Sequence, residues 1–474
     1  MEDVVAERVM GTFFAPPSLK DVKRILVLAV PAMLALLTQT AINLVDTYLI
    51  GMLPEPERTH GQAMLSHSLT FLWAIGGFLS AISVGTQALV GRRIGQNEPL
   101  GAGAVLANAL VLAFIASSVA ACVFIPLIPK FFSLSSSDPE YVRIAGSYTK
   151  WRFVGLVSMV VTAAYKSFYD GTGRTYVHFW AAVLMNIVNG ALCWLLIFGR
   201  AGMPRMGAEG AGLAAAVSSW VGVVAMLLFS LRPIDQLKYK PYRPGTLSAA
   251  VMKNLARLSV PSGVATTVVM SGFLAFIWIV GLIDGQSSAD GVVREPVNGA
   301  ATTIIINVLS LTFFSCMAFG VSTATLVSQS MGASDPDSAE RYAWSSVKLA
   351  VLAFGILGAT EVIWPEFWLR IFNDSPAVIE VGKAPMRMMG ASGPFIAGGM
   401  ILTQALFGAG NPRFVMFVEV SLHFGVLLPV AYVGGILLNG GLLGIWSSAA
   451  VYVLLLTAIM TWKFRSNTWK SIVL

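Results

Sequence analysis

Long apolar stretches separated by short polar segments run through the whole sequence. Two of them, 141–165 and 339–364, carry charges near one end, whereas ten windows are free or nearly free of charge: 25–50, 62–90, 99–129, 175–199, 210–231, 258–283, 296–327, 388–407, 414–438 and 439–462. Because a bilayer core about 30 Å thick needs about 20 mostly apolar residues per helix, the pattern predicts twelve transmembrane helices. The stretches are continuously apolar rather than alternating, which favours helices over barrel strands and predicts an all-α integral membrane protein.

The composition excludes several classes of protein. Of the 474 residues, 56% are apolar and 12% are charged, and the mean hydropathy is +0.74. Soluble domains carry about 25% charged residues, so we exclude a nucleic-acid-binding protein, a disulfide scaffold and a disordered chain. The three cysteines lie far apart and form no metal-binding pattern, so we expect neither a metal nor a cofactor. The polar first 24 residues lack the apolar core of a signal peptide, and we expect none.

The distribution of basic residues predicts the orientation of the chain. With the N-terminus placed in the cytoplasm, the inner segments contain 20 Lys and Arg residues and the outer segments contain 11. Cytoplasmic loops carry the excess of basic residues in membrane proteins, so we expect both termini inside. The net charge of +7 then reflects this topology, with the anionic lipid surface as its partner.

The two halves of the sequence resemble each other. Pro31 and Gly51 recur as Pro261 and Gly281 at a shift of 230, and after an insertion of seven residues further matches follow at a shift of 237, namely Val90, Gly95, Pro99, Gly171 and Gly173 with Val327, Gly332, Pro336, Gly408 and Gly410. Six spans in each half make the halves parallel, as in transporters that work by alternating access. We therefore expect two pseudo-symmetric six-helix lobes with a central cleft. The predicted parts are a cytoplasmic N-terminal segment (1–24), an N-lobe (25–231), a cytoplasmic linker (232–257), a C-lobe (258–462) and a cytoplasmic tail (463–474).

Several motifs resemble those of the MATE (multidrug and toxic compound extrusion) family. They are VGTQALVGRRIGQNEP (84–99) with VSTATLVSQSMGASDP (321–336), FYDGTGRT (168–175) with ALFGAGNPR (405–413), and the first span PAMLALLTQTAINLVDTYLIG (31–51). The resemblance implies a monomeric antiporter of the MOP flippase superfamily fold that exports amphipathic, mostly cationic compounds, driven by protons or sodium ions. It also suggests the inner membrane of a bacterium as the location. NIVNGALCWLLIFG (186–199) is similar to the DinF-like branch, with Cys193 at the position where that branch has Asp.

One face of the first span carries the predicted coupling site. Gln39, Asn43 and Asp46 are spaced by four and three residues, so they share a helical face. A carboxyl group in an apolar environment favours its neutral form and can bind and release a proton. The family resemblance assigns Asp46 as the proton or cation site and adds Asn189. The alternative is a structural carboxyl near the outer end of the helix. Because Cys193 and the pair Ala214–Ala215 remove oxygen ligands, we expect protons rather than sodium ions.

A second group of residues is expected to line the substrate cavity: Asn186, Met270, Phe273, Asn307, Lys150 and Arg387. Lys150 and Arg387 lie one repeat shift of 237 apart, and they either reach the membrane interface or face the cleft. We place Glu361 at an interface near an outer helix end. Glu419 and His423, four residues apart, are expected to contact each other.

Two other functions remain possible on the sequence alone. A lipid-linked oligosaccharide or lipid flippase of the same superfamily would use Lys150 and Arg387 to hold a pyrophosphate group. A membrane-embedded transferase would need paired carboxylates or a His/Asp constellation, for which Glu419 and His423 are the one candidate found. The internal repeat favours transport over catalysis, and we expect the protein not to be an enzyme.

Overall fold

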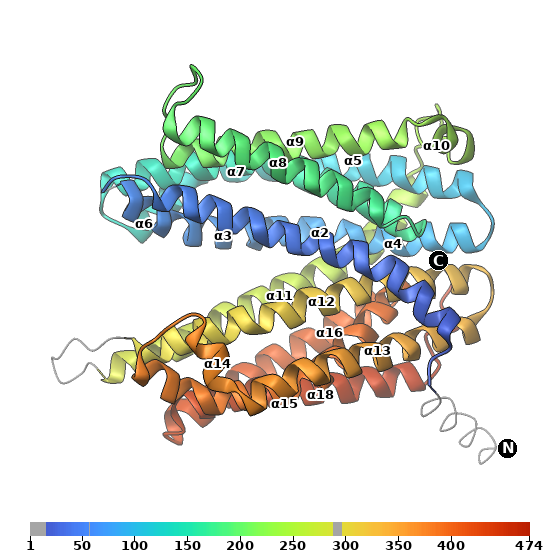
Figure 1. The fold of residues 1–474 in the computed structure, drawn as a ribbon. Helices are drawn as coiled ribbons and strands as arrows, with labels where there is room; N and C mark the ends of the chain where they lie inside the picture. The colour runs from blue at the N-terminus through green and yellow to red at the C-terminus, as the bar shows by residue number, and fades with distance from the viewer. Residues whose placement is uncertain (1–15, 56, 288–295) are drawn as a thin grey trace, which may run out of the picture. The chain divides into compact units, whose positions relative to one another are not determined.

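The computed structural model describes residues 16–55, 57–287 and 296–474, apart from the side chains of residues 39–41, 43, 66, 135, 286 and 287. Its elements are α2 (Leu19–Gly51), α3 (Glu57–Ser80), α4 (Ile82–Gly95), α5 (Pro99–Phe124), η1 (Ile125–Leu127), α6 (Ile128–Ser135), α7 (Pro139–Gly171), α8 (Tyr176–Phe198), α9 (Ala208–Ser230), α10 (Pro233–Lys238), α11 (Ala249–Ser287), α12 (Val297–Gly332), α13 (Pro336–Ile363), α14 (Pro365–Arg370), α15 (Pro376–Gly408), α16 (Pro412–Leu422), η2 (His423–Leu427), α17 (Leu428–Tyr432), η3 (Val433–Leu437) and α18 (Gly441–Arg465) (Figure 1). The described part of the chain contains helices and no strand, which confirms the all-helical prediction.

The helices coincide with the predicted membrane spans. Nine stretches of the described residues are long and apolar enough to cross a membrane. The other three predicted spans lie in α2, α7 and α15, each a helix of 33 residues. The protein is therefore a multi-pass membrane protein.

The contacts divide the chain into two compact units. The N-unit is Val30–Thr267, and the C-unit combines the chain up to Ala29 with Val268–Val473. The unit boundaries fall inside α2 and α11, so each of these helices contributes to both units. In the C-unit, Ile25 and Leu28 of α2 pack with Leu326 and Tyr342.

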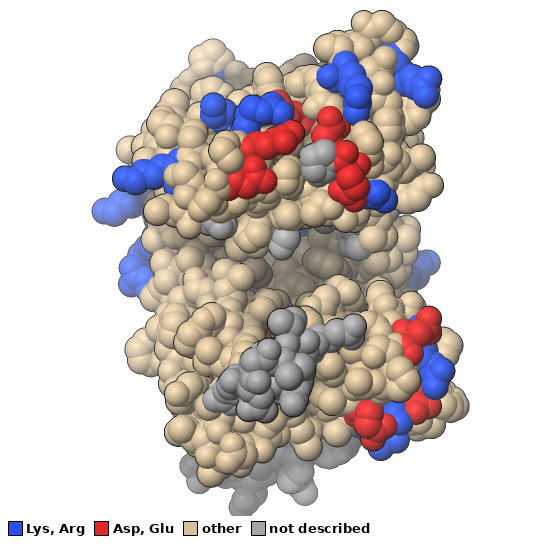
Figure 2. Space-filling model, turned by 90° about the vertical axis from the view of Figure 1, so that its left-hand side faces the viewer, with Lys and Arg blue, Asp and Glu red and all other residues tan. Residues whose placement is uncertain are grey.

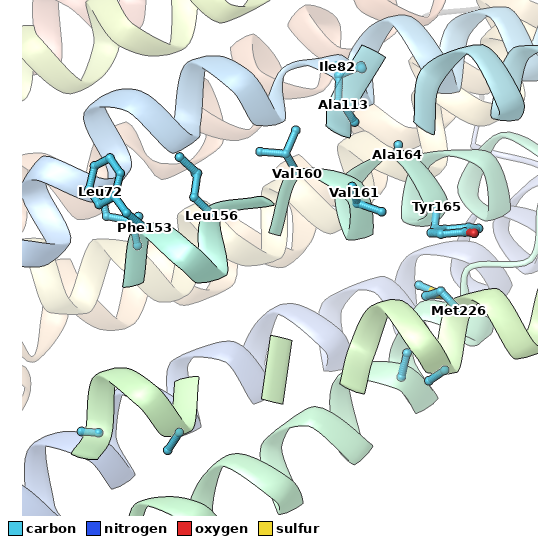
Figure 3. Packing of buried hydrophobic residues seen from close by; sticks show 14 of the residues in the cluster. Leu72, Ile82, Ala113, Phe153, Leu156, Val160, Val161, Ala164, Tyr165 and Met226 are labelled. Carbon is cyan, nitrogen blue, oxygen red and sulfur yellow. The ribbon is translucent and has the colours of Figure 1, made fainter. Parts of the chain in front are cut away.

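The core of the N-unit surrounds α7. Large buried side chains of α7 pack against α3, α4, α5 and α9. Figure 3 shows this packing, with Leu72, Ile82, Phe153 and Met226 among the labelled residues. Leu255 of α11 also belongs to this core. Figure 2 shows acidic and basic groups gathered on one face of the molecule. In the N-unit, Arg205 pairs with Glu57 at 3.1 Å.

The internal repeat reappears as a repeated backbone conformation. Asn97 and Ser334, 237 residues apart, are both left-handed, with φ of 59° and 58°. Gly173 and Gly410, at the same shift, have φ of 78° and 87°. Left-handed residues commonly end helices, and glycine adopts this conformation without steric cost. These turns explain why the corresponding inner segments of the two halves resemble each other.

Two repeated glycines permit equivalent close contacts between helices. A Cβ atom added at Gly171 would lie 3.0 Å from the backbone oxygen of Gln87. At Gly408 it would lie 2.5 Å from the backbone oxygen of Ala324. Gln87 and Ala324 are themselves 237 residues apart. The motifs of the two halves therefore encode the same helix-packing contact, since glycine in membrane helices lets backbones approach closely.

Candidate functional site

The carboxyl group of Asp46 is the centre of a buried polar cluster in the N-unit. Its residue is 4% exposed although it lies on α2 only five residues before the helix ends at Gly51. The side-chain amide of Asn189 donates a hydrogen bond of 2.9 Å to Asp46 Oδ1, and the thiol of Cys193 donates one of 3.2 Å to the same oxygen. Asn189 and Cys193 are four residues apart on α8, so one helical face presents both donors.

A third helix orients the amide of Asn189. Ser218 of α9 donates a hydrogen bond of 3.2 Å from its hydroxyl to Asn189 Oδ1. This bond leaves the NH₂ group of Asn189 to face Asp46, because an amide side chain has one carbonyl and one NH₂ end. Ser218 and Asn189 are 3% and 1% exposed, so the arrangement is shielded from water.

Asn186 joins α8 to α2 at a second point. Its amide donates a hydrogen bond of 2.9 Å to the backbone oxygen of Thr38. The bond fixes the two helices near the predicted polar face of α2. The side chains of Gln39 and Asn43 lie outside the described residues, so their predicted contribution stays a prediction.

Arg152 is a part of the site that the sequence analysis missed. It is half-buried on α7 and interacts electrostatically with both Asp46 and Cys193. Its Nε atom is buried without a hydrogen-bond partner. Arg152 therefore adds a positive charge to a site that otherwise consists of neutral donors and one carboxyl group.

The other predicted cavity residues are not gathered around Asp46 by the described contacts. Lys150 is an exposed residue of α7 in the N-unit. The remaining four belong to the C-unit, where Met270 is half-buried and the others are exposed: Met270, Phe273, Asn307 and Arg387. Their part in a substrate cavity stays a prediction.

Glu361, expected at an interface near an outer helix end, is covered by protein, and its depth in the membrane stays a prediction. Glu361 is 2% exposed, and its Oε1 atom is buried without a hydrogen-bond partner. The cause is the close approach of α15, since a Cβ atom at Gly390 would lie 2.7 Å from Glu361 Cβ. The expected contact between Glu419 and His423 is present, at 3.4 Å.

The described residues contain no group of three His, Cys, Asp or Glu side chains that could hold a metal ion. The hydrogen bonds to Asp46 come from an amide nitrogen and a thiol, which are both donors. Such a pair suits a carboxyl group that exchanges a proton, because hard cations require several oxygen ligands.

The chain is similar to known transporters over almost its whole length. A family model described as MatE matches residues 31–195 and 261–433. The probable multidrug resistance protein NorM of Thermotoga maritima is 26% identical over 94% of this chain and 93% of its own length. The multidrug resistance protein NorM of Burkholderia vietnamiensis is 26% identical over 96% of both chains.

Solved structures agree in fold. A MOP superfamily transporter from Pyrococcus furiosus matches with a TM-score of 0.83 at 18% identity and covers 95% of this chain and 97% of its own. The eukaryotic MATE transporter AtDTX14 matches with a TM-score of 0.80 at 16% identity, over 95% and 97% of the two chains. Because the MatE model matches well over half of the sequence, this chain belongs to the MATE family of membrane transporters.

Proposed function

We propose that this protein is a proton-coupled antiporter that exports amphipathic drugs or toxic organic compounds by alternating access. The buried hydrogen-bonded carboxyl group of Asp46 is the observation that carries the coupling part of the proposal. The substrate class rests on relatives named multidrug resistance proteins, among them PmpM of Pseudomonas aeruginosa, 24% identical over 87% of this chain and 83% of its own. The proposed location is the inner membrane of a bacterium. The protein would work as a monomer, with both termini in the cytoplasm.

Asp46 couples the two transported species through linkage. A proton on Asp46 removes the negative charge that the Asn189 amide and Arg152 stabilise, and this changes the polar face of α2 and α8. If protonation weakens substrate binding, substrate binding must weaken protonation by the same factor. A proton that moves inward gains about 2.3 kcal/mol per 100 mV, which provides the driving force for export.

Proton coupling is favoured over sodium coupling by the atoms around Asp46. Asn189 Oδ1 already accepts the hydroxyl of Ser218, and the other neighbour of the carboxylate is a thiol. The groups that meet the carboxylate are thus an NH₂ group and a thiol, and neither presents a hard oxygen ligand to a cation held there. The flippase alternative, in which Lys150 and Arg387 would hold a pyrophosphate group, finds no support in the names of the relatives.

Reconstitution in liposomes tests this function. We would load ethidium as a cationic probe, or calcein as an anionic one, and impose a proton gradient or a sodium gradient separately. The expected result is efflux of ethidium driven by the proton gradient and its loss in Asp46→Asn. Asp21→Asn is the matched control, because Asp21 is also a buried carboxyl on α2 but lies near Arg341 at 3.4 Å. Proton-driven efflux of normal rate in Asp46→Asn contradicts the assignment of the proton site.

A further inference from the structure

The C-unit contains a buried cluster that the coupling site at Asp46 does not use. Glu419 on α16 and His423 at the start of η2 are 7% and 3% exposed. The hydroxyl of Tyr452 on α18 donates a hydrogen bond of 2.8 Å to Glu419 Oε2. Nδ1 of His423 lies 3.4 Å from the same oxygen and 2.9 Å from the backbone oxygen of Glu419. Two groups from different helices thus converge on one carboxyl oxygen.

The cluster is packed tightly against its neighbours. The rings of His423 and Tyr452 meet edge to face, with centroids 4.7 Å apart. On the other side, His423 rests on α11 at Gly272, where an added Cβ atom would lie 2.5 Å from His423 Cδ2. The imidazole ring therefore contacts both α11 and α18, and these contacts restrict its movement away from Glu419.

In the described part of the chain, Glu419 forms no ion pair with a Lys or Arg residue, although Arg413 on α16 and Arg465 on α18 lie on the surrounding helices. Neither α11 between 268 and 283 nor α15 between 388 and 408 contains a charged residue. On α18, Lys463 lies over the ring of Phe414 at 5.0 Å and donates a hydrogen bond to Thr468. The titratable groups that face the carboxyl are therefore His423 and Tyr452.

A carboxylate in such a place is costly when it is ionised. Removal of a charge from water without a partner of opposite charge costs several kcal/mol, and the usual response is to bind a proton. The Tyr452 hydroxyl can donate to either form of Glu419, and the imidazole of His423 can hold a proton within reach of Oε2. The geometry therefore suits a group that carries one exchangeable proton.

The helix changes its geometry directly after the cluster. Residues His423–Leu427 and Val433–Leu437 form π-helical turns, with Pro429 between them in α17. π-helical turns are rare and frequently lie at functional sites. The proton-carrying side chains thus adjoin the irregular part of this membrane span.

We propose that Glu419, His423 and Tyr452 form a second proton-binding site, in the C-unit. The carboxylate takes up one proton from water to become a neutral carboxylic acid, and release returns that proton to water. This inference rests on the proposed proton coupling and extends it from one carboxyl group to two. The structure places His423 of this cluster against α11 at Gly272.

Infrared difference spectroscopy of the purified full chain during a pH titration tests the site directly. We expect a carbonyl-stretch band of a protonated carboxyl group that titrates in the wild type and is lost in Glu419→Gln. Glu361→Gln is the matched control, since Glu361 is another buried Glu of the C-unit that does not contact His423 or Tyr452 in the described hydrogen bonds, and its variant should keep the Glu419 band. An unchanged titrating spectrum in Glu419→Gln overturns the proposal.

Two further variants keep the test decisive. Tyr452→Phe retains the carboxyl group but removes its hydrogen bond, so the band should remain and move to a higher frequency; an unmoved band overturns the proposal even if Glu419→Gln does not fold. Asp46→Asn should leave the Glu419 band in place. The infrared band tests the second proton-binding site, whereas loss of proton-driven ethidium efflux in Asp46→Asn tests the proposed function. One proposal can therefore be contradicted without the other.

Discussion

Asn189 and Asp46, 143 residues apart in the chain, form a hydrogen bond of 2.9 Å inside the N-unit. The bond connects α8 to the last turns of α2, and the hydroxyl of Ser218 fixes its direction. A carboxyl group that gains and loses a proton needs a hydrogen-bond partner whose own charge stays constant. The amide of Asn189 meets that need, because it is neutral at every pH at which the protein is folded.

Asn189→Ala should disturb both the fold and the coupling. It removes a donor to Asp46 and the acceptor of Ser218, and an unsatisfied buried polar group costs about 1–3 kcal/mol. We expect a lower thermal unfolding temperature and an altered dependence of proton-driven efflux on pH. Asn186→Ala is the matched control, because its amide bonds to a backbone oxygen of α2 and should leave the pH profile unchanged. Equal pH profiles in both variants contradict the role of Asn189.

Arg152→Gln should shift the pH dependence of efflux. The variant removes a positive charge that acts on Asp46, so the ionised carboxylate loses a stabilising interaction. We expect half-maximal efflux to move toward higher pH. Lys150→Gln, on the same helix but exposed, serves as the comparison and should show no such shift. A profile identical to the wild type in Arg152→Gln argues against this charge.

Arg174 and Asp235 should be strongly coupled in stability. Their side chains form a two-pronged ion pair, one contact of which is 3.1 Å, between the turn after α7 and the short helix α10 in the linker. Asp235 is 2% exposed, and loss of one member of a buried pair costs about 3–5 kcal/mol. We expect Arg174→Ala to lower the unfolding temperature in detergent markedly. In a double-mutant cycle with Asp235→Ala, the second substitution should cost little; simple additivity would contradict the coupling.

Asp335 should make stability depend on pH. It begins α13 as its N-cap, where its Oδ1 accepts a hydrogen bond of 3.0 Å from the backbone nitrogen of Ser338. The hydrogen bonds from Ser338 lower the pKa of the Asp335 carboxyl. A lowered pKa in the folded state means that the contribution is present at neutral pH and is lost as the pH falls through that value.

Two substitutions separate the cap from its titration. Asp335→Ala should cost about 1 kcal/mol at neutral pH, whereas Asp335→Asn keeps the cap and should cost much less. Because Asn does not titrate, the advantage of the wild type over Asp335→Asn should shrink in acid. The measurement is the unfolding temperature at neutral and acidic pH. If the difference in unfolding temperature between the wild type and Asp335→Asn were the same at neutral and acidic pH, titration of Asp335 would not contribute to stability.

The hydropathy pattern was sufficient to predict the helices, because a membrane span must be apolar along its whole length. Even α7 and α15, which carry several charges, were recognisable, since α15 has its charges near its start and α7 keeps a charge-free apolar stretch between the charges at its two ends. The repeat also predicted where helices end, because glycines at turns have a conformational role that does not depend on distant contacts.

The rest depends on which face of a helix meets which neighbour. The repeat in the sequence points to Lys150, yet the basic residue that acts on Asp46 is Arg152, two residues away and on a different face of α7. Likewise, the chain does not show that Tyr452 meets Glu419 across 33 residues. Glu361 stands near Trp364 in sequence, but glycines on α15 bring that helix close enough to cover it. Such contacts arise from tertiary packing and leave no local pattern.

The two ends of α2 belong to different units, and so do the two ends of α11, so the protein cannot be cut in the linker into two complete units. Ile25 and Leu28 of α2 pack with Leu326 and Tyr342 of the C-unit, while the first half of α11 contributes Leu255 to the core of the N-unit. A break in the linker would therefore leave two incomplete fragments. The first would lack the part of α11 that belongs to its core, and the second would lack the part of α2 that belongs to its own. Two separately synthesised halves would have to exchange these helical segments, as domain-swapped dimers do, before either half could form its complete hydrophobic core.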